Sequence, residues 1–334
     1  MMIWFTWRQF RSQTVIAAAA LAAVGVLLLF TARIMTDLYA PVAACHSDCA
    51  SLVTEFLARF RSSAAFPAYL TALGAAYVLP AMLGIFWGAP LVARELETGT
   101  HRLAWNQSVT RTRWLAVKLA VGCAIAATST GLLSWAVTVW SQRVDTASHD
   151  RMLPLLFGSR GIVPVGYALF AFLLGVTTGM LLRRVVPAIA ATLAIHVGAV
   201  AAMPLWVRAH LIPAQHETIA LDAQHIQGIS IAGPGGTMAV VGHEEVEGAW
   251  TVGNRTITSD GTTFTGPADP TTCGPDASMV QCREWLGSLG LRQDLLYHPG
   301  NHFWPLQWAE AGIFIGLAAL LAAFCFWWIR HRIV

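Results

Sequence analysis

The sequence contains few charged residues for its length. Of 334 residues, 12% are Asp, Glu, Lys or Arg, whereas soluble domains carry about 25%. Hydrophobic residues make up 56% and the mean hydropathy is +0.57. A soluble protein with so few charges lacks the polar groups to cover its surface. The composition therefore argues against a soluble enzyme and predicts that much of the chain lies in lipid.

Lysine is almost absent, because Lys118 is the only lysine among 21 basic residues. A phosphate-binding P-loop needs a lysine directly after a glycine-rich loop, and no such loop precedes Lys118. The chain therefore lacks an ATPase site of this kind, and energy from ATP would have to come from a partner. The formal net charge of +3 is too small and too dispersed to indicate nucleic-acid binding.

Six apolar stretches are long enough to cross a bilayer core, which takes roughly 20 helical residues. They are 15–32, 68–93, 115–140, 163–182, 185–207 and 309–329. We therefore expect an all-α membrane protein with six transmembrane helices. The expected parts are an amphipathic leader at 1–13, helices one to five at 14–207, an extracellular domain at 208–305, and helix six with its tail at 306–334.

The arginines predict the orientation of these helices, since short cytoplasmic loops are enriched in Lys and Arg. Ten arginines fall in the leader, the loop after helix two, the Arg183-Arg184 turn and the C-terminal tail. The other ten are spread over much longer segments on the opposite side. We expect a multi-pass protein of the bacterial plasma membrane with both termini in the cytoplasm.

The cysteines fall into three pairs. Four lie in the two predicted outside regions: Cys45, Cys49, Cys273 and Cys282. Even pairs in an oxidising compartment predict disulfides, and Cys45–Cys49 with Cys273–Cys282 is the most local of the possible pairings. A zinc site is a less favoured alternative, because no adjacent C-x-x-C or H-x-x-x-H pair completes it. His298 and His302 have ligand-like spacing, but Pro299 and Gly300 between them argue against a shared helical face. Cys123 and Cys325 lie inside apolar helices and are expected to serve packing.

The region 208–305 is the one part with soluble character. Its middle, 228–264, mixes β-branched runs with glycines, and Ser259-Asp260-Gly261-Thr262 predicts a hairpin turn. We expect a small α+β domain inserted between helices five and six.

The predicted cytoplasmic loop 94–114 is the most informative stretch. Glu95 and Glu97 are its acidic residues, and Gly99 is expected to end helix two. A short following helix would present Trp105 among polar neighbours as a surface for a partner. The alternative is a solvated loop held by lipid headgroups.

Four further residues are candidates for a transport pathway or gate. An ionisable side chain inside a membrane is a functional hypothesis by default, and His196 lies inside helix five. The alternative is a neutral histidine hydrogen-bonded to a neighbouring helix. Glu310 opens helix six near the outer boundary, where it either gates the exit or accepts hydrogen bonds from Gln307 or an arginine. Thr128 either lines a path or bonds back to its own helix.

Three G-x-x-x-G spacings also occur, at Gly84/Gly88, Gly175/Gly179 and Gly312/Gly316. They suit close helix packing, but in a glycine-rich chain they do not establish a dimer face.

The loop resembles a known family. The run Arg94-Glu-x-Glu-x-Gly-Thr-x-Arg-Leu-x-Trp-x-Gln-Ser is similar to the cytoplasmic loop of actinobacterial ABC-2-type transporter permeases. So are the N-terminal aromatic and basic leader and the run Phe303-Trp304-x-x-Gln307-x-x-Glu310 before the last helix. The resemblance covers most of the membrane part and does not extend to the outside domain, which is longer here than in typical members.

In that family the loop holds a coupling helix that rests in a groove on the ATP-binding subunit, and the leader is an interfacial elbow. The resemblance implies two sets of residues. The coupling residues are Glu95, Glu97, Gly99, Thr100, Arg102 and Trp105, and the elbow residues are Trp4, Trp7 and Arg8.

The resemblance thus implies a non-catalytic permease subunit of an ATP-driven exporter. Its partners would be a cytoplasmic ATP-binding protein that supplies Mg-ATP and a second permease protomer, identical or related. No cofactor or metal is expected in this chain. Two alternatives are a membrane sensor or scaffold with a ligand-binding outer domain and, less favoured, an integral-membrane enzyme. The sequence contains no H-E-x-x-H or G-x-S-x-G motif to support the latter.

Overall fold

The computed structural model describes residues 2–99, 110–222, 226–231, 238–242, 246–266, 271–273 and 278–332. They form two compact units, each described here by itself. Unit 1 comprises Met1–Leu211 and Trp304–Val334, and unit 2 comprises Ile212–Phe303. The predicted outer domain, 208–305, contains unit 2, and Arg208 belongs to unit 1.

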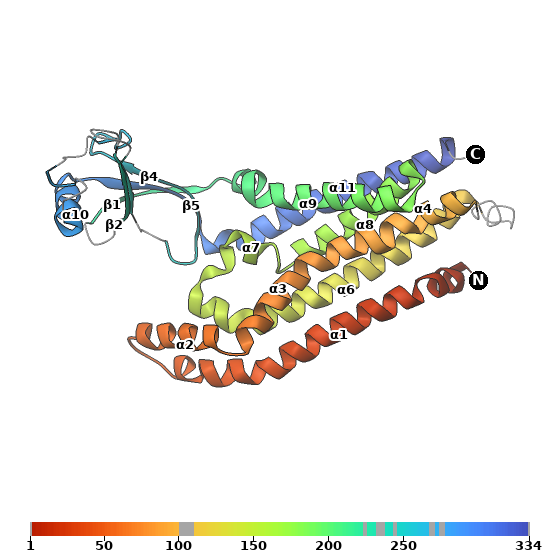
Figure 1. Ribbon diagram of the computed structural model, residues 1–334, viewed down its shortest axis with the longest axis horizontal. Helices are drawn as coiled ribbons and strands as arrows, with labels where there is room; N and C mark the ends of the chain where they lie inside the picture. Colours follow the sequence, from red (N-terminus) through yellow and green to blue (C-terminus); the bar gives the residue numbers. More distant parts are fainter. Residues whose placement is uncertain are drawn as a thin grey trace. The chain divides into compact units, whose positions relative to one another are not determined.

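Unit 1 is a helical bundle (Figure 1). Its principal helices are α1 (Met2–Ala43), α2 (Ala50–Ser62), α3 (Ala65–Met82), α4 (Ala89–Thr98), α6 (Arg111–Ser148), α7 (Pro154–Phe157), α8 (Val163–Leu182), α9 (Val185–Ala202) and α11 (Phe303–His331). The π-helical turn η1 (Leu83–Gly88) joins α3 to α4, and the short turns η3 (Met203–Val207) and η4 (Arg208–His210) extend α9.

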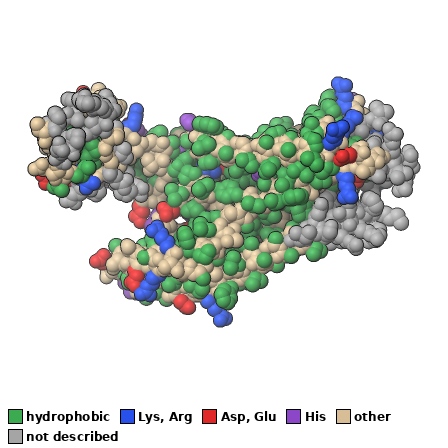
Figure 2. All heavy atoms as spheres, in the orientation of Figure 1, with side chains coloured by type: hydrophobic (Ala, Val, Ile, Leu, Met, Phe, Trp, Pro, Cys, Tyr) green, Lys and Arg blue, Asp and Glu red, His purple; other side chains and the backbone are tan. Residues whose placement is uncertain are grey.

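Six helical segments in the described part of the chain are long and apolar enough to cross a membrane, as predicted. They are Ala17–Ala43, Ala65–Thr98, Arg111–Ser148, Val163–Leu182, Val185–His210 and Gly300–His331. In Figure 2, hydrophobic side chains cover the middle of unit 1, and charged side chains gather towards its two ends. This distribution is the one a bilayer requires of a spanning bundle. Helix α2 lies in the predicted first outer loop and was not expected from the sequence.

Helix α8 forms the centre of the bundle. It contacts η1, α4, α6, α9 and α3. Of the residues in its most apolar stretch, 78% are buried within the protein, compared with 17% for the corresponding stretches of the α1 and α9 spans. The N-terminal end of α1 and the C-terminal end of α11 lie at the same end of the bundle (Figure 1).

Unit 2 contains five strands and one helix among its described residues. They are β1 (Gln215–Ala220), β2 (Ile226–Ile231), β3 (Met238–Gly242), β4 (Trp250–Ile257), α10 (Met279–Ser288) and β5 (Arg292–His298). An antiparallel sheet has the order β1-β5-β4, and β2 pairs with β3. The small core includes Leu286 from α10 and the disulfide-bonded Cys273 and Cys282.

The predicted hairpin turn after β4 is present. The Thr258 amide donates to the Thr262 carbonyl over 2.8 Å, and Gly261 has φ +85°, a left-handed conformation that glycine adopts without strain.

Candidate coupling site and buried polar networks

The predicted coupling loop begins where α4 ends. Gly99 follows the last helical residue, Thr98, with φ +73°, so it ends the helix as the sequence predicts. The chain is described again from Thr110, whose hydroxyl caps α6 by accepting a hydrogen bond from the Arg113 amide over 3.4 Å. Three predicted coupling residues lie outside the described residues: Thr100, Arg102 and Trp105.

Glu95 is held inside the bundle rather than free for a partner. Its carboxylate pairs with the ammonium group of Lys118 on α6. Lys118 is only 2% exposed; it also donates to the Leu91 carbonyl over 3.4 Å and lies 4.3 Å from the centre of the Trp114 ring. The only lysine of the chain therefore joins α4 to α6 through a largely buried ion pair.

Glu97 contacts a different helix. Its Oε2 accepts a hydrogen bond from the Val185 amide over 3.2 Å, and Val185 is the first residue of α9. A carboxylate at a helix N-terminus satisfies an otherwise unpaired amide and interacts favourably with the helix dipole. Glu95 and Glu97 together therefore tie the end of α4 to α6 and α9, just before Gly99 turns the chain.

The predicted elbow residues fall in the first turns of α1, which is helical from Met2. The side chains of Trp4, Trp7 and Arg8 lie outside the described residues. Their interfacial role stays a prediction.

Glu310 lies in a buried ion pair at the opposite end of the bundle. Its two carboxylate oxygens accept hydrogen bonds from Arg208 Nε over 2.7 Å and from Nη2 over 3.1 Å. The Tyr167 hydroxyl also donates to Glu310, and Arg208 donates to the Pro154 carbonyl over 3.0 Å. Both charged side chains are at most 1% exposed. The arrangement matches the alternative of a carboxylate bound by an arginine, and the two charges bridge α11 to the end of the α9 span.

Gln307 lies one turn before Glu310 and caps another helix. Its Oε1 accepts from the amides of Ile162 and Val163 over 3.0 and 3.1 Å, which are the N-cap and the first residue of α8. Its Nε2 donates to the Phe157 carbonyl over 3.0 Å. Gln307 therefore uses its whole amide to join α11 to the start of α8.

A third buried ion pair, between Arg160 and Asp145, was not predicted from the sequence. Arg160 pairs with Asp145 of α6 and donates to the Tyr69 hydroxyl over 2.7 Å. Burial lowers the pKa of the Arg160 guanidinium from its ordinary value, and the neighbouring Tyr69 opposes that shift. One feature of the sequence pointed to this pair: Arg160 lies directly before the apolar run 163–182. An unpaired charge beside a membrane span is costly, so such an arginine is expected to have an acidic partner.

The other two pathway candidates lie apart from these networks. His196 is buried beside the Phe170 ring, with centroids 6.2 Å apart, and no described residue bonds its Nδ1. The Thr128 hydroxyl donates to the Ala124 carbonyl of its own helix over 2.7 Å, and the residue is exposed on the bundle surface. Back-bonding was the alternative interpretation of Thr128.

Both predicted disulfides are present in the most local pairing. Cys45 bonds to Cys49 between α1 and α2, and Cys273 bonds to Cys282 in unit 2. Cys123 and Cys325 are free and lie within membrane spans.

Comparison with known proteins identifies the family of the membrane part. A family model described as ABC-2 membrane transporter related matches residues 18–208, which is more than half of the chain and ends before unit 2. No curated protein and no solved structure matches the chain. The matched segment contains five of the six spans, the polar contacts of Glu95 and Glu97, and Arg208. The chain therefore belongs to the ABC-2 membrane transporter related family.

Proposed function

We propose that the chain is the permease subunit of an ABC-2-type exporter, driven by ATP hydrolysis in a separate cytoplasmic subunit. The observation that carries the proposal is the double attachment of α4. Glu95 joins its last turns to α6 through Lys118, and Glu97 joins them to the first amide of α9. Mg-ATP would bind to the partner, and this chain would move substrate without making or breaking a covalent bond.

The attachment suits the transmission of force. A coupling segment must pass the motion of an ATP-binding subunit to the membrane helices, and a loose loop would absorb that motion. The segments α3, η1 and α4 form one continuous span, Ala65–Thr98. A displacement at Gly99 would therefore move this span together with α6 and α9, to which α4 is attached. In this proposal Glu95 and Glu97 stiffen the base of the coupling segment. The direct contacts with the ATP-binding subunit fall to the loop beyond Gly99, including Arg102 and Trp105.

The proposed orientation places the α4–α6 junction in the cytoplasm. Short cytoplasmic segments are rich in arginine, and the leader, this junction, the Arg183-Arg184 turn and the tail carry ten of the arginines. The two termini share one end of unit 1 (Figure 1), which agrees with an even number of crossings.

A second permease protomer would complete the transporter. In the most apolar stretches of the α1, α9 and α11 spans, only 17 to 22% of the residues are buried within the chain. Their apolar faces are therefore available to lipid or to a neighbouring membrane protein.

Co-purification tests the proposal. The tagged chain, expressed in its native host and extracted in mild detergent, is expected to bring down an ATP-binding protein with a P-loop. Glu97→Arg combined with Trp105→Ala should abolish that association, because it removes the α9 contact and the aromatic group of the loop. The matched control is Glu55→Arg, a charge reversal on the exposed face of α2 at the opposite end of the bundle.

Two outcomes would count against the proposal. One is a wild-type chain that purifies without any ATP-binding protein. The other is unchanged association of the double variant while it elutes as a monodisperse protein, which would move the docking surface away from the loop. Lys118→Met separates coupling from docking: it should retain the partner and lower substrate-stimulated ATPase activity, since α4 is then no longer held to α6.

A further inference from the structure

A polar pocket of about 390 Å³ lies between α1 and α6, at the end of unit 1 opposite the two termini. The two helices contact each other along the bundle (Figure 1). The pocket is lined by Tyr39 of α1 and by Val139, Gln142, Arg143 and Thr146 of α6. Four of these five side chains end in a group that donates hydrogen bonds. The pocket therefore suits a ligand with several acceptor atoms.

The donors of this pocket are available to a ligand. No described residue accepts a hydrogen bond from the Arg143 guanidinium, the Tyr39 hydroxyl or the Gln142 amide, and no described carboxylate pairs with Arg143. Arg143 and Tyr39 are only partly buried, and their polar atoms reach the surface. By contrast, the buried Arg160 and Arg208 each have a carboxylate partner. Arg143 thus brings an unpaired positive charge to the pocket.

The acidic residues nearest in sequence do not neutralise this charge. Asp145 follows Arg143 by two positions, which places it on the opposite side of α6, and it pairs with Arg160. Asp37 precedes Tyr39 by two positions on α1 and faces away from the pocket for the same reason. No described carboxylate lines the pocket. Its charge and its donors therefore favour an anion over a cation or a neutral molecule.

The position of Arg143 along α6 points to lipid phosphate as the anion. The apolar stretch of this helix ends at Trp140, and Arg143 lies about 4.5 Å further along the helix axis, at about 1.5 Å per residue. The headgroup layer extends roughly 5–8 Å beyond the hydrocarbon core on each side of a bilayer. The guanidinium is therefore expected at the depth of the headgroups.

The same face of α6 is apolar towards the middle of the span. Leu132, Trp135 and Val139 are each at least half exposed, and their spacing of three and four places them in line with Arg143. Acyl chains can lie against this stripe while a phosphate on the same molecule reaches the pocket. A free phosphate ion would use the charge and leave the stripe unused.

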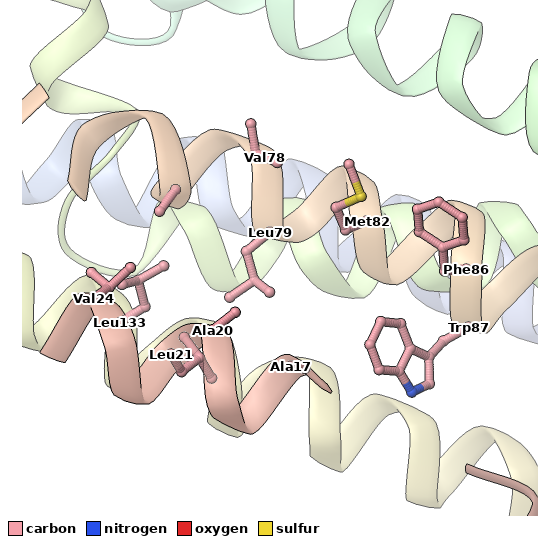
Figure 3. A pocket seen from close by; sticks show the side chains of 11 residues that line it. Ala17, Ala20, Leu21, Val24, Val78, Leu79, Met82, Phe86, Trp87 and Leu133 are labelled. Atoms are coloured by element: carbon pink, nitrogen blue, oxygen red, sulfur yellow. The ribbon is translucent and has the colours of Figure 1, made fainter. Parts of the chain in front are cut away.

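A second hollow beside α1 lacks these features. It lies between α1 and the α3–η1 segment and has a volume of about 470 Å³ (Figure 3). Its lining side chains are apolar apart from Trp87, whose indole N–H is buried. It therefore has no charge or accessible donor with which to select an occupant.

We propose that the pocket between α1 and α6 binds the phosphate of an anionic glycerophospholipid, with Arg143 as the counter-charge and Tyr39 and Gln142 as hydrogen-bond donors. The acyl chains lie against the stripe from Leu132 to Val139. The site depends on the placement of the spans in the membrane and not on an ATP-binding partner, so it can fail or succeed independently of the proposed transport function.

Photo-crosslinking of the full-length protein tests the site. Two probes carry the same diazirine-labelled acyl chain on phosphatidylglycerol or on phosphatidylcholine, and each is added at low fraction to phosphatidylcholine vesicles that contain the purified protein. Peptide mass spectrometry gives the ratio of phosphatidylglycerol to phosphatidylcholine adducts on 132–146. The exposed residues 193–197 of α9 are the reference for general lipid contact. The ratio at 132–146 is expected to exceed the reference about tenfold, the effect of one charge-assisted hydrogen bond.

Matched arginine variants separate the pocket from general surface charge. Arg143→Gln removes the charge and should bring the ratio at 132–146 down to the α9 reference, whereas Arg143→Lys keeps the charge and should retain most of the preference. Arg61→Gln removes an exposed arginine of α2 that does not line the pocket and should leave the ratio unchanged. Thermal unfolding and gel filtration establish that the variants are folded.

Competition identifies the source of the phosphate. Unlabelled phosphatidylglycerol should displace the phosphatidylglycerol probe from 132–146, and inorganic phosphate in excess should not. Displacement by inorganic phosphate would show a site for the free ion and overturn the lipid assignment. A wild-type ratio at 132–146 equal to the α9 reference would overturn the site without any variant, and so would an equal loss of preference in the Arg143→Gln and Arg61→Gln variants.

Discussion

Individual buried charges determine much of how this chain holds its helices together. Arg208, Glu310 and Lys118 are each at most 2% exposed, and each has a partner of opposite charge or a carbonyl group. A charge left alone in such surroundings is very costly. Each of these residues therefore fixes the position of a second helix as well as its own.

The Arg208–Glu310 pair allows a test at this scale. Glu310→Gln leaves the buried Arg208 without a counter-charge and is expected to lower the free energy of unfolding by about 3–5 kcal/mol. The double variant Arg208→Met with Glu310→Leu removes both charges and should lie closer to the wild type. Thermal unfolding in detergent, followed by fluorescence-detected gel filtration, measures both. A single variant that is as stable as the double variant would show that the pair does not hold α11 in place.

The partners in these networks could not be predicted from the sequence. Glu310 and Gln307 were identified as polar residues that open the last helix, and acceptance from an arginine was one of the alternatives. The arginine itself, Arg208, is separated from Glu310 by 102 positions, and nothing in the local pattern favours it over Arg160. Only the packing of α8 between the two spans determines which arginine meets which carboxylate.

Between helices, the backbones pack closely where η1 crosses α8. The first two predicted G-x-x-x-G pairs face each other there: a side chain at Gly84 would meet the backbone of Ala171, and one at Gly175 would meet the backbone of Ala89. At the third pair, Gly312/Gly316, a Cβ added to either glycine would have no described atom within 4 Å. The same spacing therefore has different roles in different helices.

This difference predicts opposite results for one substitution. In Gly84→Ala the new Cβ would lie 2.7 Å from the Ala171 carbonyl oxygen, so η1 and α8 must separate, at a cost of about 1–3 kcal/mol. Gly312→Ala on α11 adds a methyl group into open space and should be neutral or slightly stabilising, because alanine favours helix. Melting temperatures of the two variants decide the matter. Equal destabilisation by both would mean that α11 also packs closely through its glycines.

The spans themselves could be predicted because each is a long apolar run. The predicted span 163–182 coincides with α8, while α1, α3–α4 and α6 extend beyond their predicted ends. Helix α2 was missed because it is short and carries Glu55 and Arg59 on an exposed face. In unit 2, β5 was missed because its polar residues Gln293 and Asp294 are buried by side-chain contacts with β4, which a sequence pattern does not reveal.

At the scale of the whole molecule, the arginines and the disulfides mark the two sides of the membrane. The arginine-rich segments are predicted to lie in the cytoplasm, and the disulfides are predicted to lie outside it. The arginine-rich segments contain both termini and the α4–α6 junction, whereas Cys45–Cys49 follows one complete crossing by α1. Disulfides persist in oxidising compartments outside the cytoplasm. Two independent features, charge and redox chemistry, therefore indicate the same orientation.

Cysteine labelling on intact cells tests this orientation. A membrane-impermeant maleimide should label the wild-type protein only after an impermeant reductant opens the disulfides, since Cys123 and Cys325 lie within spans. Replacing all four disulfide cysteines by serine should remove that labelling. In this background Thr98→Cys, at the exposed end of α4, should react only after the cells are permeabilised. Labelling of Thr98→Cys on intact cells would place the α4–α6 junction outside, where no cytoplasmic ATP-binding subunit could reach it, and the proposed function would then be wrong.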